Sequence, residues 1–237
     1  MKKLFGIFFA ILFVACSSKK DSIAFNDSFE DKGNNITLTF ECNLTVSHPQ
    51  LSRQNSKILR DSIIATTFGD KLAKYNNKKV LKKYAKSSLA TFVESTDSTL
   101  TDIKLYTKID GEIVYADDTY VTFRRIMSTN TTTNAQTLMT TCNYYVFDAK
   151  TGRNLSEKDI FTPQQMNAMR SLLVNHAKEM AAQNEININT RRVRPNGNFA
   201  IFDSTIVYTF NPYEIAHPRI GFIEIALEGK EEILSIK

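Results

Sequence analysis

Residues 36 to 46 alternate strictly between apolar and polar side chains. The apolar set is Ile36, Leu38, Phe40, Cys42, Leu44 and Val46, and the residues between them are Thr37, Thr39, Glu41, Asn43 and Thr45. A two-residue period places one set on each face of a β-strand, and an antiparallel sheet commonly buries only one of its faces. The pattern therefore predicts a half-buried antiparallel strand in which Cys42 points inward.

Helical and extended patterns follow this strand along the chain. Apolar spacing predicts helices over 51–68 and 78–93. Strand-like stretches cover 99–109, 112–127 and 136–148. We expect the first two of these strands to form a hairpin at Asp110-Gly111, because this dipeptide is a strong turn signal.

The second half of the chain contains a well-marked helix start. Thr162-Pro163-x-Gln165 combines an N-cap, a proline at the first helical position and a capping-box partner. We expect the helix to present one stripe to a sheet, formed by Met166, Met169, Leu173, His176 and Met180. Strands are expected over 199–202, 205–210 and 221–227. The absence of a regular βαβ rhythm favours an α+β fold, with a mainly antiparallel sheet packed by a few amphipathic helices.

The amino-terminal end has the pattern of a bacterial lipoprotein signal. Lys2 and Lys3 precede an apolar run over 4–14, and Ala15-Cys16-Ser17-Ser18 follows. The run is too short to span a bilayer, which takes about 20 apolar residues. A plain signal peptide ending near the same place would not need this cysteine. We therefore expect lipidation of Cys16, which would hold the chain in the inner or outer membrane, facing the periplasm or the cell surface.

These features give a provisional domain plan. It consists of a signal peptide over 1–15, a flexible tether over 16–35, and two α+β subdomains over 36–140 and 141–237. Loss of the signal would lower the formal net charge from +5 to +3, because it removes Lys2 and Lys3. Cys42 and Cys142 either pair, which an extracytoplasmic compartment allows, or remain buried free thiols.

Two basic segments are candidate sites for an anion or an acidic partner. Helical spacing places Lys74, Lys78, Lys82 and Lys86 on one face. The second segment contains Arg191, Arg192 and Arg194 before Pro195-Asn196-Gly197. Either segment can instead be an ordinary solvated surface. Nucleic acid is an unexpected partner outside the cytoplasm.

Residues typical of catalysis or metal binding do not cluster in the sequence. The three histidines, His48, His176 and His217, stand far apart and lack the short-spaced ligand pairs of zinc sites. No serine or cysteine sits in a nucleophile motif beside a histidine. We therefore expect no metal, no cofactor and no enzymatic activity.

Two segments resemble a known family. Residues 145–155 read YVFDAKTGRNL and are followed by DIF at 159–161, and residues 202–216 read FDSTIVYTFNPYEIA. Over about 140–227 the chain resembles a family of extracytoplasmic domains of unknown function. Such domains form the lysozyme-binding receptor half of the RsiV anti-sigma factor and adjoin the catalytic domain of the PdaC peptidoglycan deacetylase. The segment 36–140 is similar to the family's partner domain in the order of its elements.

The family motif spans Asn211, Pro212, Tyr213, Glu214, Ile215 and Ala216, together with Gly221. Pro212 indicates a strand end, because proline cannot donate to a sheet ladder. We expect Tyr213 and Ile215 to turn inward, Glu214 to face out, and Gly221 to form a bulge or a close backbone approach. The motif either builds a corner of the fold or binds a ligand through Tyr213 and Glu214.

We therefore predict a binding module. This prediction rests on the family resemblance, on the expected lipid at Cys16 and on the lack of a catalytic motif. Its ligand would be a cell-wall glycan, such as peptidoglycan, or an envelope protein. A lysozyme-binding sensor or inhibitor and an accessory subunit of an envelope complex are the alternatives. The positive charge of the chain disfavours the hypothesis that it binds lysozyme, because most lysozymes are themselves basic.

Overall fold

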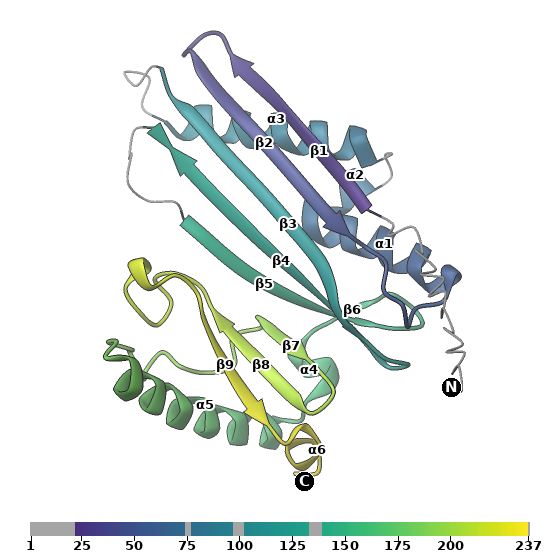
Figure 1. Cartoon of the computed structure of the whole chain (residues 1–237), viewed down its shortest axis with the longest axis vertical. Helices are drawn as coiled ribbons and strands as arrows, with labels where there is room; N and C mark the ends of the chain where they lie inside the picture. The colour runs from purple at the N-terminus through teal and green to yellow at the C-terminus, as the bar shows by residue number, and fades with distance from the viewer. Residues whose placement is uncertain (1–21, 74–76, 97–101, 133–138, 237) are drawn as a thin grey trace, which may run out of the picture.

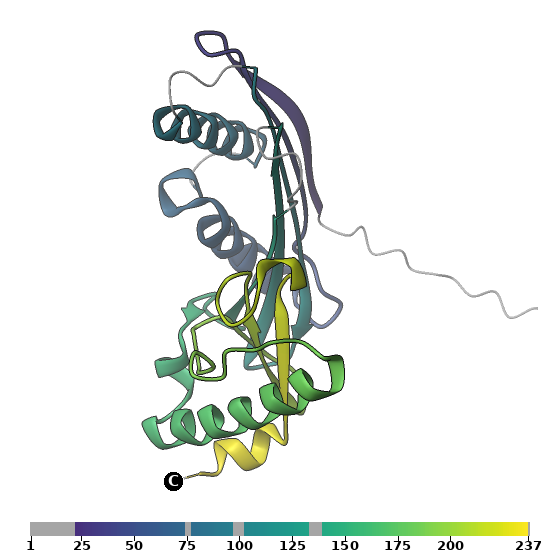
Figure 2. The same ribbon diagram turned by 90° about the vertical axis from the view of Figure 1, so that its left-hand side faces the viewer.

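The computed structural model describes residues 22–73, 77–96, 102–132 and 139–236. In this part of the chain two sheets lie end to end, and helices pack against each of them (Figures 1 and 2). All strand pairs but one are antiparallel. The α+β fold class is therefore confirmed. No helix within the described ranges is long and apolar enough to cross a membrane, and Cys16 lies outside these ranges.

The larger sheet has six strands in the order β1-β2-β3-β4-β5-β6. They are β1 (Ser22–Asp31), β2 (Ile36–Thr45), β3 (Lys104–Ala116), β4 (Tyr120–Thr131), β5 (Met139–Asp148) and β6 (Asn154–Leu155). Only β2 and β3 run parallel. A parallel pair needs a crossover connection, which here contains α1 (Arg53–Phe68), α2 (Asp70–Ala73) and α3 (Asn77–Ser95). These helices pack on one face of the sheet (Figure 2).

The alternation predicted over 36–46 is confirmed. All six apolar residues of that stretch are at most 2% exposed, and Phe40 and Cys42 are fully buried. They pack in one core cluster with Leu59 and Ile63 of α1 and Leu81 of α3. The predicted helices 51–68 and 78–93 match α1 and α3 closely because their buried residues recur at helical spacing.

The predicted tether over 16–35 is wrong for residues 22–31, which form β1. This strand pairs antiparallel with β2 along its whole length, from Ser22 opposite Thr45 to Asp31 opposite Ile36. Only Ile23 and Phe29 of β1 are buried. An edge strand has one strand neighbour, so it can keep many polar side chains in solvent, and this hides its periodicity in the sequence.

The predicted hairpin at Asp110-Gly111 is also wrong. Both residues lie inside β3, which continues to Ala116, and the chain turns at 117–119. Gly111 is required for close packing rather than for a turn. A Cβ atom at this position would lie 2.5 Å from Cζ of Phe123 and 2.8 Å from Cδ2 of Leu44.

The smaller sheet has the order β7-β8-β9 and is antiparallel. Its strands are β7 (Phe199–Ile201), β8 (Thr205–Phe210) and β9 (Ile223–Glu228), close to the predicted ranges. The remaining elements are α4 (Glu157–Ile160), α5 (Pro163–Asn184), the short 3-10 helix η2 (Pro218–Ile220) and α6 (Lys230–Leu234).

The predicted start of α5 is confirmed. The Thr162 side chain accepts a hydrogen bond from the Gln165 N–H, and the Gln165 side chain accepts one from the Thr162 N–H. The most buried stripe of α5 consists of Gln165, Met169, Leu173 and Ala177. Of the five predicted stripe residues, Met169 and Leu173 are fully buried, whereas the other three flank the stripe and are half-buried.

Side-chain amides join the two sheets. Oδ1 of Asn198 accepts a hydrogen bond from the Tyr144 N–H at 2.8 Å, and its Nδ2 donates to the Cys142 carbonyl at 2.8 Å. Asn198 thus pairs with the free edge of β5 as a neighbouring strand would. Because β5 and β6 belong to the larger sheet, the sheets divide the chain after Leu155 rather than at residue 141.

Cys42 and Cys142 are both buried and free, so the possible disulfide is not formed. Cys42 belongs to β2 and Cys142 to β5, and β3 and β4 lie between them. Adjacent strands are about 4.8 Å apart. Three such steps exceed the roughly 7 Å limit between bridged Cα atoms.

Candidate functional site

The three predicted arginines lie together around a hollow near the end of β8. Arg191, Arg192 and Arg194 line a cavity of about 310 Å³. The other lining residues are Asn196, Phe210, Glu214 and Ile215. We call this cavity the arginine hollow. It brings the basic loop and the family motif, two sequence features predicted separately, into one place.

Backbone contacts hold the basic loop against the motif. Ile188 forms an isolated antiparallel bridge with Ala216, and the Asn189 N–H donates to the Ile215 carbonyl at 2.7 Å. Nη1 of Arg192 donates to the Tyr213 carbonyl at 3.2 Å. The loop therefore runs beside the motif. Arg192 has a structural role as well as a charge, because it contacts the backbone of the motif.

Among the described residues, Tyr213 is the most exposed large hydrophobic side chain, at 63% of its surface. The prediction that it turns inward is wrong. Its φ of 73° lies in the left-handed region, which directs the chain through a turn closed by the Glu214 N–H on the Asn211 carbonyl. A left-handed conformation costs a residue with a side chain about 1–3 kcal/mol. The turn thus holds an aromatic ring in solvent at an energetic cost.

The rest of the motif behaves largely as predicted. Ile215 is buried and Glu214 is exposed. The strand ends at Phe210, before Pro212. Gly221 is different, because a Cβ there would have no neighbour within 4 Å. Its φ of 84°, at the end of η2, is the reason for glycine at this position.

The arginine hollow has an excess of positive charge. Glu214 is the one acidic residue in its lining, and its Oε2 accepts a hydrogen bond from Nδ2 of Asn196 at 3.1 Å. None of the three arginines, all of them exposed described residues, has a carboxylate within salt-bridge distance. No carboxylate therefore competes with an anionic ligand for Arg191 and Arg194, whereas Nη1 of Arg192 already donates to the Tyr213 carbonyl.

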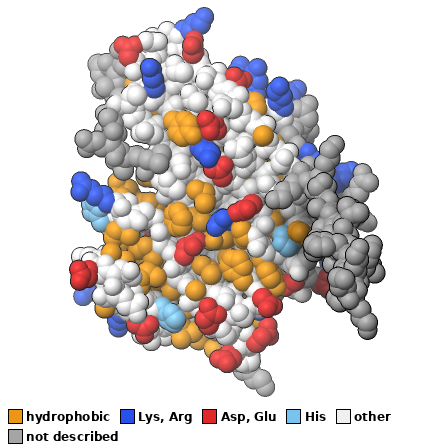
Figure 3. Space-filling model, in the orientation of Figure 1, with side chains coloured by type: hydrophobic (Ala, Val, Ile, Leu, Met, Phe, Trp, Pro, Cys, Tyr) orange, Lys and Arg blue, Asp and Glu red, His pale blue; other side chains and the backbone are white. Residues whose placement is uncertain are grey.

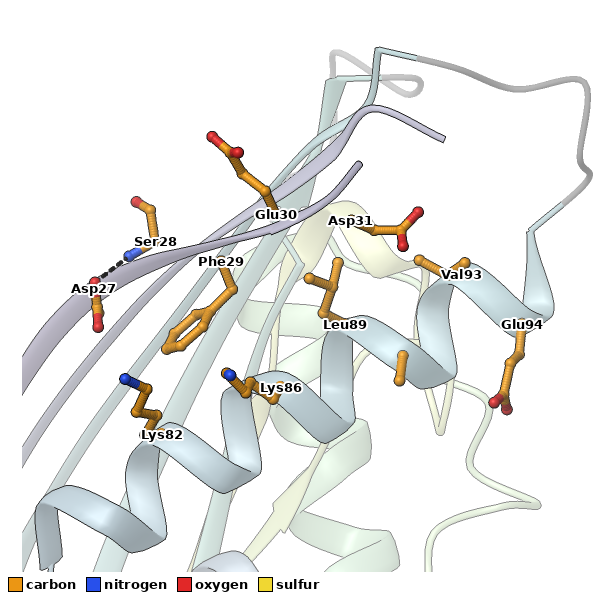
Figure 4. Close-up of a pocket in the computed structure, with 11 residues that line it drawn as sticks. Asp27, Ser28, Phe29, Glu30, Asp31, Lys82, Lys86, Leu89, Val93 and Glu94 are labelled. Carbon is orange, nitrogen blue, oxygen red and sulfur yellow. Dashed lines mark hydrogen bonds between the residues drawn. The ribbon is translucent and has the colours of Figure 1, made fainter. Parts of the chain in front are cut away.

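Two of the predicted lysines line a second, larger hollow, of about 660 Å³, between β1 and α3 (Figure 4). Its strand wall is formed by residues 27–31. Its helix wall is formed by Lys82, Lys86, Leu89, Ala90, Val93 and Glu94. We call this hollow the lysine groove.

The lysines and the arginines do not converge, because the two hollows share no lining residue. Lys78 is exposed on α3 but does not line the groove. Lys74 lies outside the described residues. The structure therefore contains two separate candidate surfaces.

The face turned away from α1 and α3 is shown in Figure 3, where hydrophobic side chains gather over the lower half. Cys142, Tyr144 and Ala200 form a small buried cluster with Phe202 and Phe222 packed against it. The Tyr144 hydroxyl donates to Oε1 of Glu224 at 2.9 Å. Burial, and then the Glu224 charge, raise the pKa of Tyr144, so this hydrogen bond persists through neutral pH. The cluster joins the two sheets, because Cys142 and Tyr144 belong to β5 and Ala200 to β7.

The cysteine thiols are poor nucleophiles. Burial raises the pKa of both Cys42 and Cys142 to about 12, so both are protonated at neutral pH. The histidine ring of His217 accepts a hydrogen bond from the Arg219 N–H and caps η2. Among the described residues, no three His, Cys, Asp or Glu side chains are grouped closely enough to hold a metal ion.

Of the three asparagines that build the site, Asn211 belongs to the family motif predicted from the sequence, whereas the contacts of Asn196 and Asn198 were not predicted. Nδ2 of Asn196 donates to the Thr209 carbonyl at 2.9 Å as well as to Glu214, and Oδ1 of Asn211 accepts from the Cys142 N–H at 2.8 Å. Asn196 and Asn198 flank Gly197, whose φ is 80°. Asn196 and Gly197 belong to the predicted basic loop, but the long-range partners of this turn, from 13 residues away at Thr209 to 56 residues away at Cys142, could not be predicted from the local sequence.

Residues 158–228 match the model of a family described as a protein of unknown function, DUF3298. The match contains α5, the smaller sheet, the basic loop and the motif. The prediction of a domain of unknown function in this part of the chain is thus confirmed at that level. No curated protein matches the chain.

Two solved structures share the fold over nearly the whole chain. One is a member of the DUF3298 family from Bacteroides fragilis, with 19% identity and a TM-score of 0.66, covering 91% of this chain and 92% of that chain. The other is a DUF3298 family protein from Pseudomonas aeruginosa, with 12% identity and a TM-score of 0.58, covering 91% and 94%. At these identities the likeness concerns the fold.

Proposed function

We propose that this protein is a non-catalytic lipoprotein of the bacterial cell envelope that binds an anionic cell-wall glycan. A lipid on Cys16 would anchor it in the inner or outer membrane, facing the periplasm or the cell surface. The proposal rests mainly on the arginine hollow, where three exposed guanidinium groups surround a concave surface without a carboxylate partner.

The residues around the hollow suit such a ligand. Guanidinium groups bind carboxylates through paired, charge-assisted hydrogen bonds, and peptidoglycan fragments carry carboxylates on their stem peptides. The exposed ring of Tyr213, beside Glu214, offers an apolar face for a sugar ring to pack against. A hollow of about 310 Å³ is at the small end of ligand pockets, which begin near 300 Å³. It suits one unit of a longer chain.

Calorimetric titration with soluble muropeptides tests the proposal. The full chain in detergent should bind them, and R191Q/R194Q should weaken binding by roughly tenfold or more, because hydrogen bonds to charged groups each contribute about 1.5–3 kcal/mol. Arg192 is left intact because it holds the Tyr213 carbonyl. The matched control is K71Q/K78Q, which removes the same charge outside both hollows.

Three results would count against the proposal. The first is wild-type protein that binds no muropeptide at millimolar concentration. The second is an equal loss of affinity in R191Q/R194Q and K71Q/K78Q, which would show a diffuse charge effect. The third is turnover of the glycan by the purified protein, which would make it an enzyme.

A further inference from the structure

Glu214 places a negative charge in the otherwise basic lining of the arginine hollow. None of the salt bridges among the described residues joins it to Arg191, Arg192 or Arg194. Of its two carboxylate oxygens, Oε2 accepts the hydrogen bond from Nδ2 of Asn196, and no described residue donates a hydrogen bond to Oε1. The hollow therefore contains both signs of charge, and they do not neutralise each other.

The fold fixes the position of the Glu214 carboxylate. Nδ2 of Asn196 donates to the Thr209 carbonyl at 2.9 Å as well as to Glu214 at 3.1 Å. Oδ1 of Asn196 accepts from the Asn198 N–H at 3.1 Å. Only this orientation of the amide satisfies these contacts, because a flipped amide would place its oxygen against the Thr209 carbonyl. The Glu214 N–H donates to the Asn211 carbonyl at 3.0 Å. A carboxylate held in this way needs little ordering when a ligand binds.

A ligand that carries only negative charge would not match the whole hollow. Its anionic groups would pair with Arg191 and Arg194 but would also lie beside the Glu214 carboxylate, and like charges brought together at a binding site cost affinity. Specific binding sites commonly combine such a repulsive element with the attractive ones. Glu214 thus favours a ligand that has a cationic group close to its anionic group.

We propose that the arginine hollow recognises a zwitterionic group, in which one carbon atom carries both an ammonium and a carboxylate. The carboxylate pairs with the guanidinium groups of Arg191 and Arg194, and the ammonium donates to Oε1 of Glu214. An ammonium has three donors and no acceptor, so a carboxylate oxygen is a suitable partner for it. This inference rests on the proposed glycan function. It names the unit that the hollow binds, which is the diamino acid of a stem peptide while its side-chain amine is free.

Cross-linking of the glycan would remove the recognised group. A cross-link converts the side-chain ammonium of the diamino acid into an amide, which has no charge and one N–H donor. The amide would leave Glu214 without a cationic partner. It would also bring a second peptide to a hollow of only about 310 Å³. The protein should therefore bind uncross-linked stem peptides in preference to cross-linked ones.

Acetylation of the amine provides the test. The probe is a soluble muropeptide that contains the diamino acid with its amine free. It is compared with the same muropeptide after N-acetylation, which removes the positive charge and keeps every carboxylate. Both are titrated calorimetrically onto the full chain in detergent. We expect the free-amine form to bind roughly three- to tenfold more tightly, as expected for one exposed ion pair with a charge-assisted hydrogen bond.

Glu214→Gln separates recognition of the amine from support of the fold. Glutamine has nearly the same shape and can still accept from Asn196, but it carries no charge. The variant should bind the free-amine form more weakly than wild type does and the acetylated form more tightly, because it loses both the attraction and the repulsion. A purely structural role would weaken the binding of both forms. The matched control is Glu179→Gln, which removes the same charge from an exposed residue outside the hollow.

The inference is overturned if wild type binds the two forms with equal affinity, or if Glu214→Gln keeps the preference for the free amine. In either case, binding that R191Q/R194Q still weakens would leave the glycan site in place, so the two proposals fail separately. If neither form binds at millimolar concentration, both proposals fail.

Discussion

Tyr213 has two energetically unfavourable features that a tyrosine packed in the core would not have. It has a left-handed backbone and leaves its ring in water. Glycine would adopt the same backbone without strain. A strained backbone persists where the surrounding structure holds it, and such residues cluster at ligand sites. This supports binding, and not the building of a corner, as the role of the exposed ring.

Substitution of Tyr213 separates these two roles. In Tyr213→Gly, relief of strain should offset the greater entropy of the unfolded chain, leaving the free energy of unfolding unchanged or up to about 1 kcal/mol higher. Muropeptide affinity should fall. Urea denaturation and calorimetry measure the two effects. A loss of more than about 1 kcal/mol of stability would instead show that the ring supports the fold.

Gly111 should tolerate no side chain. In Gly111→Ala the new methyl group would press on Phe123 and Leu44 inside the core of the larger sheet. We expect a loss of about 1–3 kcal/mol, the usual cost of overpacking. Gly33→Ala is the control, because the nearest atom there, Oδ2 of Asp31, lies 3.6 Å from the built Cβ. Equal denaturation midpoints for the two variants would refute the close packing.

Asp117 links stability to pH. Partial burial raises the pKa of its carboxyl group, but hydrogen bonds from the Tyr120 and Thr119 N–H groups and the Tyr115 hydroxyl outweigh burial and lower it below 3.8. A lowered pKa in the folded state stabilises the protein above the unfolded value, and this contribution disappears as pH falls through the folded value. Asp117→Asn should therefore be less stable than wild type at pH 7, and the difference should shrink on acidification below about pH 4. Thermal unfolding at several pH values measures it, and a pH-independent difference would contradict the assignment.

Residues whose pattern depends on near neighbours could be predicted from the sequence. The alternation from Ile36 to Val46 and the cap at Thr162 are local, and both are confirmed. The role of Gly111 could not be predicted, because the space for a side chain there is taken by Phe123 on the adjacent strand. The backbone of Tyr213 could not be predicted either, because no local rule shows that a tyrosine will adopt a left-handed conformation.

At the scale of elements, β1 shows what an edge position does to a sequence signal. Its exposed positions include Asn26, Asp27 and Ser28, which read as a flexible segment because a strand with one neighbour needs few apolar residues. The structure instead makes these residues one wall of a groove. Part of the expected tether thus belongs to the sheet, which sequence periodicity could not indicate.

Asn198 should be the most sensitive link between the two sheets. Asn198→Ala leaves the Tyr144 N–H and the Cys142 carbonyl without their partner, and each such loss costs about 1–3 kcal/mol. Asn198→Asp can still accept from Tyr144 but cannot donate to Cys142, so its loss should also be clear. Asn187→Ala, at an exposed position, is the control. If chemical denaturation shows no difference among the three variants, the amide does not hold the sheets together.

At the scale of the whole molecule, the fold separates the positive charge of the chain into two surfaces. The arginine hollow lies at the motif end of the smaller sheet, and the lysine groove lies along the edge of the larger one. The sequence predicted both basic segments, but the distance between them in the fold depends on the topology of both sheets. The sequence predicted the basic loop and the family motif separately, and the hollow between them was not predicted, because residues 191–196 and 210–215 meet only in the fold.

Backbone amide shift mapping with a soluble muropeptide tests the proposed glycan site in the arginine hollow. We expect saturable shifts confined mainly to 188–198 and 210–216, with β1 and α3 unaffected, and their disappearance in R191Q/R194Q. Shifts that centre elsewhere, or that are unchanged in that variant, would contradict it.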